Sequence, residues 1–145
     1  MGTMPAEQRR GPATTVNRTV EWVDTDAAGH QHNSAIMRWV EAAEAQLMRE
    51  LGLVEYFPLA PRVQQVINFR DKLWFGQQVT ATVWVERVGN ASLTLGFDVF
   101  GHPCERSAGG AAADGTLTTV HVPADGTASA PWPAPIRAVL AGARP

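Results

Sequence analysis

The sequence has a single cysteine, Cys104, among its 145 residues. One thiol excludes an intramolecular disulfide framework and any metal site built from several cysteines. Long apolar runs are also missing, so no segment is long enough to span a bilayer. Arg9 and Arg10 are not followed by the apolar core of a secretory signal. We therefore expect a cytoplasmic protein that does not enter a membrane.

Lysine is scarce as well, since Lys72 is the only one beside eleven arginines, and the formal net charge is -2. This balance leaves no basic surface for nucleic acid and no polybasic patch for a membrane. A hydrophobic content of 45% and a charged content of 18% are typical of a globular chain. The length suits one domain with a real core.

Three segments are expected along the chain. Residues 1–13 are rich in glycine, proline and charge, and indicate a flexible N-terminal arm. Residues 14–122 carry the periodic patterns and form the predicted domain. Residues 123–145 are a proline-rich tail, in which Ile136 to Leu140 is a candidate short helix.

The clearest element is a helix of about five turns with a broad apolar stripe. Asn33 or Ser34 is expected to cap its start, and Gly52 to mark its end. The stripe recurs at spacings of three and four residues: Ile36, Trp39, Val40, Ala43, Leu47 and Leu51. Such a face must be covered by another element.

Strands supply that cover. We expect them at Thr14–Val23, Arg62–Phe69 and about Ala111–Val122, together with a hairpin whose arms alternate over residues 79–86 and 93–99. An odd-length hairpin loop over residues 88–90, or a bulge, is needed to place both apolar sets on one face. The three-residue loop would pair Val85 with Leu93. One sheet with one long helix on its apolar face predicts a two-layer α+β fold.

The chemistry-bearing residues gather between the first strand and the helix, over residues 24–33. This loop delivers carboxylates, two imidazoles and an amide to the positive end of a helix. Free N–H groups at a helix N-terminus stabilise an oxyanion. A nearby carboxylate can act as nucleophile or as general base toward water. The segment is therefore suited to attack on a carbonyl.

The loop and the start of the helix, Asp24-Thr25-Asp26-Ala27-Ala28-Gly29-His30 with Asn33 and residues 36–41, resemble the signature of 4-hydroxybenzoyl-CoA thioesterase-like hotdog proteins. The resemblance covers roughly residues 15–122. It implies a hotdog fold, in which a curved antiparallel sheet wraps around one long central helix. It also implies a homodimer, or a homotetramer, with acyl-CoA bound at the subunit interface.

The resemblance places the catalytic carboxylate at Asp26. Backbone N–H groups from Gly29 to Ala35, Ser34 included, would bind the oxyanion. His30 would orient Asp26 or the loop, and Asn33 is either a helix cap or a group that positions water or substrate. Glu41 is the alternative catalytic carboxylate, because another hotdog group uses a helix-borne glutamate.

Arg62, Arg70 and Lys72 are candidates for contacts with the phosphates of CoA. His30 and His32 are a poor metal pair without further ligands nearby, so no metal site is expected.

The sequence thus predicts an acyl thioesterase that acts on acyl-CoA or on an acyl carrier protein and needs no metal or redox cofactor. The alternative is a non-catalytic acyl-binding or assembly module on the same fold. A dehydratase would need a different histidine-centred motif.

Overall fold

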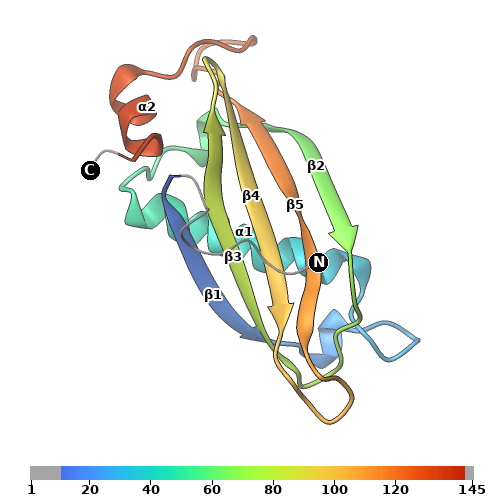
Figure 1. Ribbon diagram of the computed structural model, residues 1–145. Helices are drawn as coiled ribbons and strands as arrows, with labels where there is room; N and C mark the ends of the chain where they lie inside the picture. Colours follow the sequence, from blue (N-terminus) through green and yellow to red (C-terminus); the bar gives the residue numbers. More distant parts are fainter. Residues whose placement is uncertain (1–10, 143–145) are drawn as a thin grey trace.

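The protein, analysed as a computed structural model that describes residues 11–142, is a five-stranded antiparallel sheet crossed on one face by a long helix (Figure 1). The order of strands across the sheet is β1-β3-β4-β5-β2. The strands are β1 (Ala13–Thr19), β2 (Arg62–Phe69), β3 (Gln78–Val88), β4 (Ser92–Gly101) and β5 (Gly110–Val120). The helices are α1 (Asn33–Glu50) and α2 (Ala134–Leu140), with 3-10 turns η2 (Trp22–Asp24) and η3 (Phe57–Leu59).

The core lies between α1 and the sheet. The alternating apolar residues of β3 and β4 face α1, whose predicted stripe from Ile36 to Leu47 is buried against them. α1 packs mainly on β1, β3 and β4. Each fully buried Val, Leu, Ile or Phe side chain contributes about 1.5–3 kcal/mol of transfer free energy, so this contact dominates the stability of the fold. The two-layer α+β prediction is confirmed.

The start of α1 corrects the sequence-based expectation. The residue before the helix is His32, and its ring Nδ1 accepts the Ser34 N–H at 3.1 Å, so His32 is the cap rather than Asn33 or Ser34. The predicted stop is confirmed, because Gly52 adopts φ 72°. Its N–H reaches the Arg49 carbonyl, and the Leu53 N–H reaches the Met48 carbonyl, which closes the last turn.

The β3–β4 hairpin combines a bulge with a longer loop. Val85 pairs with Leu95, not with Leu93, and the register shifts between Val85 and Arg87. Glu86 is the extra residue of the bulge, and Val88 pairs with Leu93 across a four-residue connection. The bulge keeps both apolar sets on the α1 face, as predicted, but the predicted three-residue loop and its pairs were wrong.

Both ends of the predicted domain differ in detail. The first strand ends at Thr19, because Trp22–Asp24 turns into η2 instead of continuing to Val23. Residues 1–10 of the expected N-terminal arm lie outside the described residues, whereas the Pro12 carbonyl accepts the Val85 N–H at 2.8 Å. The short C-terminal helix begins at Ala134, before the expected Ile136. Within the described part of the chain, no helix is long and apolar enough to cross a membrane.

Candidate active site

The loop that precedes α1 folds into a small hairpin of its own. Thr25 and Gln31 form an antiparallel bridge, and the Asp26 N–H donates to the His30 carbonyl at 3.0 Å. Gly29 adopts φ 87° at the turn, a conformation that favours glycine. The Asp26 side chain closes the tip, since its Oδ1 accepts the Ala28 N–H at 2.8 Å. The position of Asp26 is therefore fixed by hydrogen bonds within the loop.

Gln31 ties this hairpin to the rest of the molecule. It is buried, its N–H donates to the Leu73 carbonyl at 2.8 Å, and its side-chain Oε1 accepts the Leu73 N–H at 2.7 Å. The loop from Asp71 to Gln77 thus becomes the floor beneath the hairpin. An unsatisfied buried amide costs about 1–3 kcal/mol, so this two-bond clamp holds the loop firmly.

Asp24 anchors the other side of the hairpin. Its buried carboxylate accepts the Glu21 N–H at 2.8 Å and an Arg38 N–H at 2.5 Å, while a second Arg38 N–H donates to Ser34 at 3.0 Å. Arg38 projects from the second turn of α1, so this ion pair links the loop to the helix. Asp24 is occupied as a structural residue, which leaves Asp26 as the exposed carboxylate of the pair.

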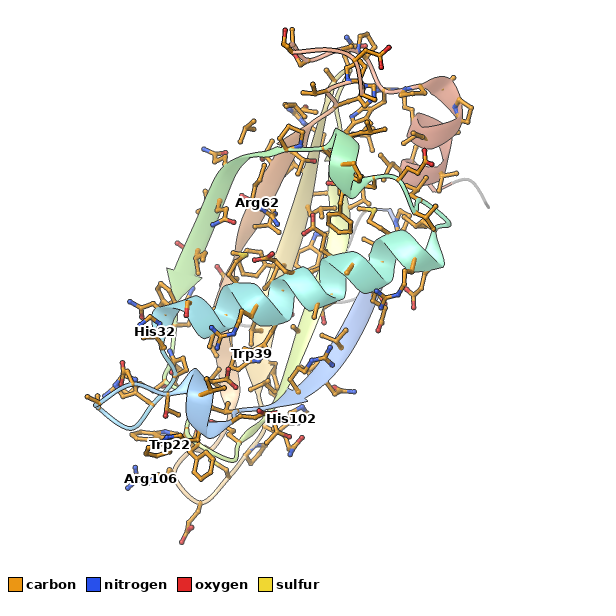
Figure 2. The ribbon with its side chains drawn as sticks, turned by 180° about the vertical axis from the view of Figure 1, so that it is seen from behind. Trp22, His32, Trp39, Arg62, His102 and Arg106 are labelled. Atoms are coloured by element: carbon orange, nitrogen blue, oxygen red, sulfur yellow. The ribbon has the colours of Figure 1, made fainter. Side chains whose placement is uncertain are left out.

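Two backbone amides are free, one at the N-terminus of α1 and one in the loop that precedes it. The Gly29, Ser34 and Ala35 N–H groups, which were expected to bind substrate, donate to the Asp26 carbonyl, to the His32 ring and to the His32 carbonyl. Within the described residues, the backbone N–H groups of His30 and Asn33 donate to no acceptor. Figure 2 shows His32 at this end of α1. Of the N–H groups predicted to bind the oxyanion, those of His30 and Asn33 are therefore the ones left without an acceptor among the described residues.

None of the other predicted catalytic side chains, which all belong to described residues, is hydrogen-bonded to Asp26. The half-buried His30 ring packs edge-on against Trp74, with 5.9 Å between ring centroids, and its buried Nδ1 has no partner among the described residues. His30 therefore holds Asp26 through its backbone carbonyl rather than through its ring. The Asn33 side chain is exposed at the first helical position, and Glu41 is exposed further along α1.

The structure separates the three predicted phosphate contacts. Arg62 lies at the start of β2 and donates to the buried Glu44 at 2.9 Å. Arg70 lies just beyond the other end of β2 and holds Asp114 with two hydrogen bonds of 3.0 and 3.1 Å. Arg70 and the exposed Lys72 share the end of the molecule that carries Asp26. Arg62 lies at the other end of β2, where its ion pair with Glu44 makes it a structural partner of α1.

Two of these carboxylates titrate abnormally for opposite reasons. Burial raises the pKa of Glu44 above 4.5, although the charge and hydrogen bond of Arg62 partly offset it. The hydrogen bonds of Arg70 lower the pKa of Asp114 below 3.8. Neither group lies in the Asp26 hairpin, so both report on the stability of the fold.

A cavity of about 370 Å³ opens beside the hairpin, lined by Gly29, the 74–77 turn and the loop that contains Cys104 and Arg106. The Arg106 guanidinium lies 4.7 Å from the centroid of the Trp74 ring. Figure 2 labels Arg106 and Trp22 at this end of the molecule, and the exposed Trp22 ring meets Phe75 edge-on. Arg106, Gln31 and Glu44 were missed from the sequence, because only their long-range partners reveal them.

Solved structures share this architecture, which is a hotdog fold. One, described as a predicted thioesterase from Bacillus stearothermophilus, has a TM-score of 0.77 at 23% identity and covers 92% of this chain and 98% of that one. Another, a mutant 4-hydroxybenzoyl-CoA thioesterase complexed with 4-hydroxybenzoyl-CoA, has a TM-score of 0.76 at 16% identity and covers 90% and 99%. The predicted fold is thereby confirmed.

Residues 20–140 match the family model of the Thioesterase-like superfamily, and the chain belongs to that superfamily. A curated relative, the 1,4-dihydroxy-2-naphthoyl-CoA hydrolase of Prochlorococcus marinus (strain NATL1A), is 27% identical over 95 residues. That alignment spans 57% of this chain and 63% of the relative, which is less than two thirds of the relative's length. The resemblance stated from the loop and helix motif is confirmed.

Proposed function

We propose that the protein hydrolyses the thioester bond of an acyl-CoA, with Asp26 as the catalytic carboxylate. The observation that carries the proposal is the pairing of an exposed, rigidly held Asp26 with two free amides, that of Asn33 at the N-terminus of α1 and that of His30 in the loop just before it. Membership of the Thioesterase-like superfamily supports it, as do similar proteins named as hydrolases of CoA thioesters.

The chemistry follows from this arrangement. Asp26 either attacks the thioester carbonyl or removes a proton from water that attacks it, and the carbonyl oxygen becomes an oxyanion. The amides of His30 and Asn33 donate to that oxyanion, aided by the positive end of α1. Collapse of the intermediate breaks the C–S bond, and the departing thiolate takes up a proton. If Asp26 is the nucleophile, the anhydride formed between Asp26 and the acyl group is then hydrolysed by water, which regenerates the carboxylate. The products are a carboxylic acid and the thiol of CoA, with one water consumed.

Glu41 is the weaker candidate for the carboxylate. It lies eight residues into α1 from Asn33, which places its backbone about 12 Å along the axis from the free amides. A carboxylate that distant cannot share a carbonyl with those donors in one protomer. Asp26 belongs to the loop that ends at the same amides.

A second copy of the chain is the proposed partner. β2 is an edge strand of the sheet, and Val63, Val66 and Phe69 on it are exposed by 58%, 40% and 48%. An apolar edge with unpaired backbone groups is a template for strand pairing, and monomers normally protect such edges. The C-terminal end of β2 adjoins the N-terminus of α1 (Figure 2). A dimer formed through β2 would therefore have its interface next to the Asp26 loop.

The test is CoA release, followed with a thiol-reactive dye, from short, long, branched and aromatic acyl-CoAs. We expect Asp26→Asn to lower kcat by about 10²- to 10⁴-fold with an unchanged melting temperature, because a carboxylate catalyst typically contributes that much. Glu41→Gln is the matched control and should retain turnover.

If Asp26→Asn keeps wild-type turnover and Glu41→Gln loses it, the catalytic carboxylate is Glu41. If the wild type binds acyl-CoAs without releasing CoA, the same panel should be repeated with acyl carrier protein thioesters. Binding without turnover on both carriers would instead make the chain an acyl-binding module.

A further inference from the structure

A second cavity, of about 250 Å³, lies at the opposite end of α1 from the Asp26 hairpin. It sits between the chain that follows α1, the end of β5 and α2, which Figure 1 shows packed at this end of the molecule. The 18 residues of α1 separate the two sites by about 27 Å. An acyl group attached at Asp26 has no need of this space, so the cavity requires its own explanation.

The outer wall of the cavity is built by the C-terminal segment and is firmly held. The Trp132 N–H donates to the Asn90 carbonyl and its indole Nε1–H to the Ser92 carbonyl, both at 3.0 Å. The Ala130 N–H donates to the His121 carbonyl at 2.9 Å, and Arg137 donates to the Gly89 carbonyl. These bonds pin the segment to the β3–β4 hairpin, so the cavity is preformed.

The lining is mainly apolar and aromatic, and the exposed Glu55 is its one charged residue. The rings of Tyr56 and Trp132 are stacked at 6.2 Å with 12° between their planes, and the His121 ring lies 5.0 Å from Trp132. Aliphatic side chains, including Leu53 and Ile136, complete the wall. The buried Tyr56 hydroxyl is engaged with Thr119 at 2.7 Å.

Among the buried side chains of this lining, one offers a hydrogen-bonding atom that is free and held in a fixed orientation. His121 is 5% exposed, and its Nδ1 lies 3.1 Å from the carbonyl oxygens of Ala130 and Pro131. Carbonyl oxygens only accept, so Nδ1 carries the proton and Nε2 of the neutral ring is left as an acceptor. Nε2 has no partner among the described residues. A backbone-fixed tautomer with a bare acceptor is a specific recognition element.

We propose that this cavity binds a compact aromatic molecule with one N–H or O–H donor, which the Nε2 of His121 accepts. An apolar cavity of about 150 Å³ already holds a benzene ring, so this volume suits one or two fused rings. The stacked rings favour an aromatic ligand over an aliphatic one. The site is independent of the proposed hydrolase activity.

The test uses indole and its isostere 1-benzothiophene, which lacks the N–H, in calorimetric titrations of the full-length protein. Indole should bind one to one, about 3- to 10-fold more tightly than benzothiophene, which is the usual worth of one hydrogen bond. His121→Asn retains a donor for the two carbonyls but lacks Nε2, so it should reduce that ratio to about one. A substitution that weakens the binding of both compounds equally leaves the ratio of their affinities unchanged, so the ratio reports only the hydrogen bond.

Ile136→Trp should fill the cavity and abolish binding of both compounds, whereas Ala138→Trp adds the same side chain at an exposed position of α2 and should not. Asp26→Asn should bind indole like the wild type. Absence of saturable indole binding to the wild type would overturn the proposal. So would equal binding by the two tryptophan variants, or an indole preference that persists in His121→Asn.

Discussion

At the scale of single residues, the catalytic proposal depends on the backbone of Asn33 and not on its side chain. Asn33 is the first residue of α1, and its N–H is the free donor at the helix N-terminus. Proline is well tolerated at this helical position, because it lacks only an N–H that the helix does not use. His32 has φ -72° and ψ 147°, which is the conformation that a residue before proline prefers.

Asn33→Pro should therefore fold normally and lose activity. We expect kcat to fall by about 10²- to 10³-fold, the usual effect of removing one oxyanion donor, with little change in melting temperature. Asn33→Ala retains the N–H and is the matched control, which should stay within a few-fold of the wild type. Equal loss in the two variants would assign the role to the Asn33 side chain instead.

The sequence was sufficient to find Asp26, because its loop motif is local and specific. It could not find the residues that hold Asp26 in place. Gln31 matters because it meets Leu73, 42 positions away, and Asp24 because it meets Arg38. His32 replaced Asn33 as the cap because its ring reaches the Ser34 N–H, an interaction that depends on the approach of the loop. Contacts of this kind appear only after folding.

At the scale of elements, the contact between α1 and β2 is unusual, because it is an ion pair in an apolar core. Glu44 is 1% exposed, and its partner Arg62 has a buried Nη1 without an acceptor in the described part of the chain. Burial raises the pKa of Glu44 above 4.5 in the folded chain. The unfolded chain therefore loses the Glu44 proton at a lower pH than the folded chain does. As the pH rises through this range, the free energy of unfolding decreases.

The change of the unfolding free energy with pH should differ in direction for the two carboxylates. Relative to Glu44→Gln, which keeps an oxygen for Arg62, the wild type should lose stability as the pH rises above 4.5. Relative to Asp114→Asn, it should gain stability as the pH rises toward and above 3.8, because Arg70 lowers the pKa of Asp114. Urea titrations from pH 3 to 7 measure both differences. Slopes of the same sign would contradict the assignment.

The elements themselves were largely predictable. β2 was placed at its observed bounds, and α1 was recognised from its stripe, because periodic burial leaves a periodic sequence. The β3–β4 pairing was off by two residues, because the bulge at Glu86 is not marked by glycine or by any other local signal. The turn at Trp22–Asp24 was likewise hidden by β-favouring residues.

At the scale of the whole molecule, the exposed edge of β2 should decide the assembly. Val66→Asp places a charge on that edge and should convert a dimer into a monomer in sedimentation velocity, with loss of turnover. Val54→Asp is the control, since Val54 is 79% exposed and lies away from the sheet edge. A wild type that sediments as a monomer, or a variant with unchanged mass, would rule out pairing through β2.

The hairpin over residues 25–31 has a consequence for how such a protein diversifies. It closes on itself at the Thr25–Gln31 bridge before the chain enters α1, and its tip at Ala27 and Ala28 is exposed. Residues can be exchanged at the tip without disturbing the clamp at Leu73 or the first turn of the helix. The two alanines are therefore free to vary between related proteins, while the geometry of Asp26 is inherited intact.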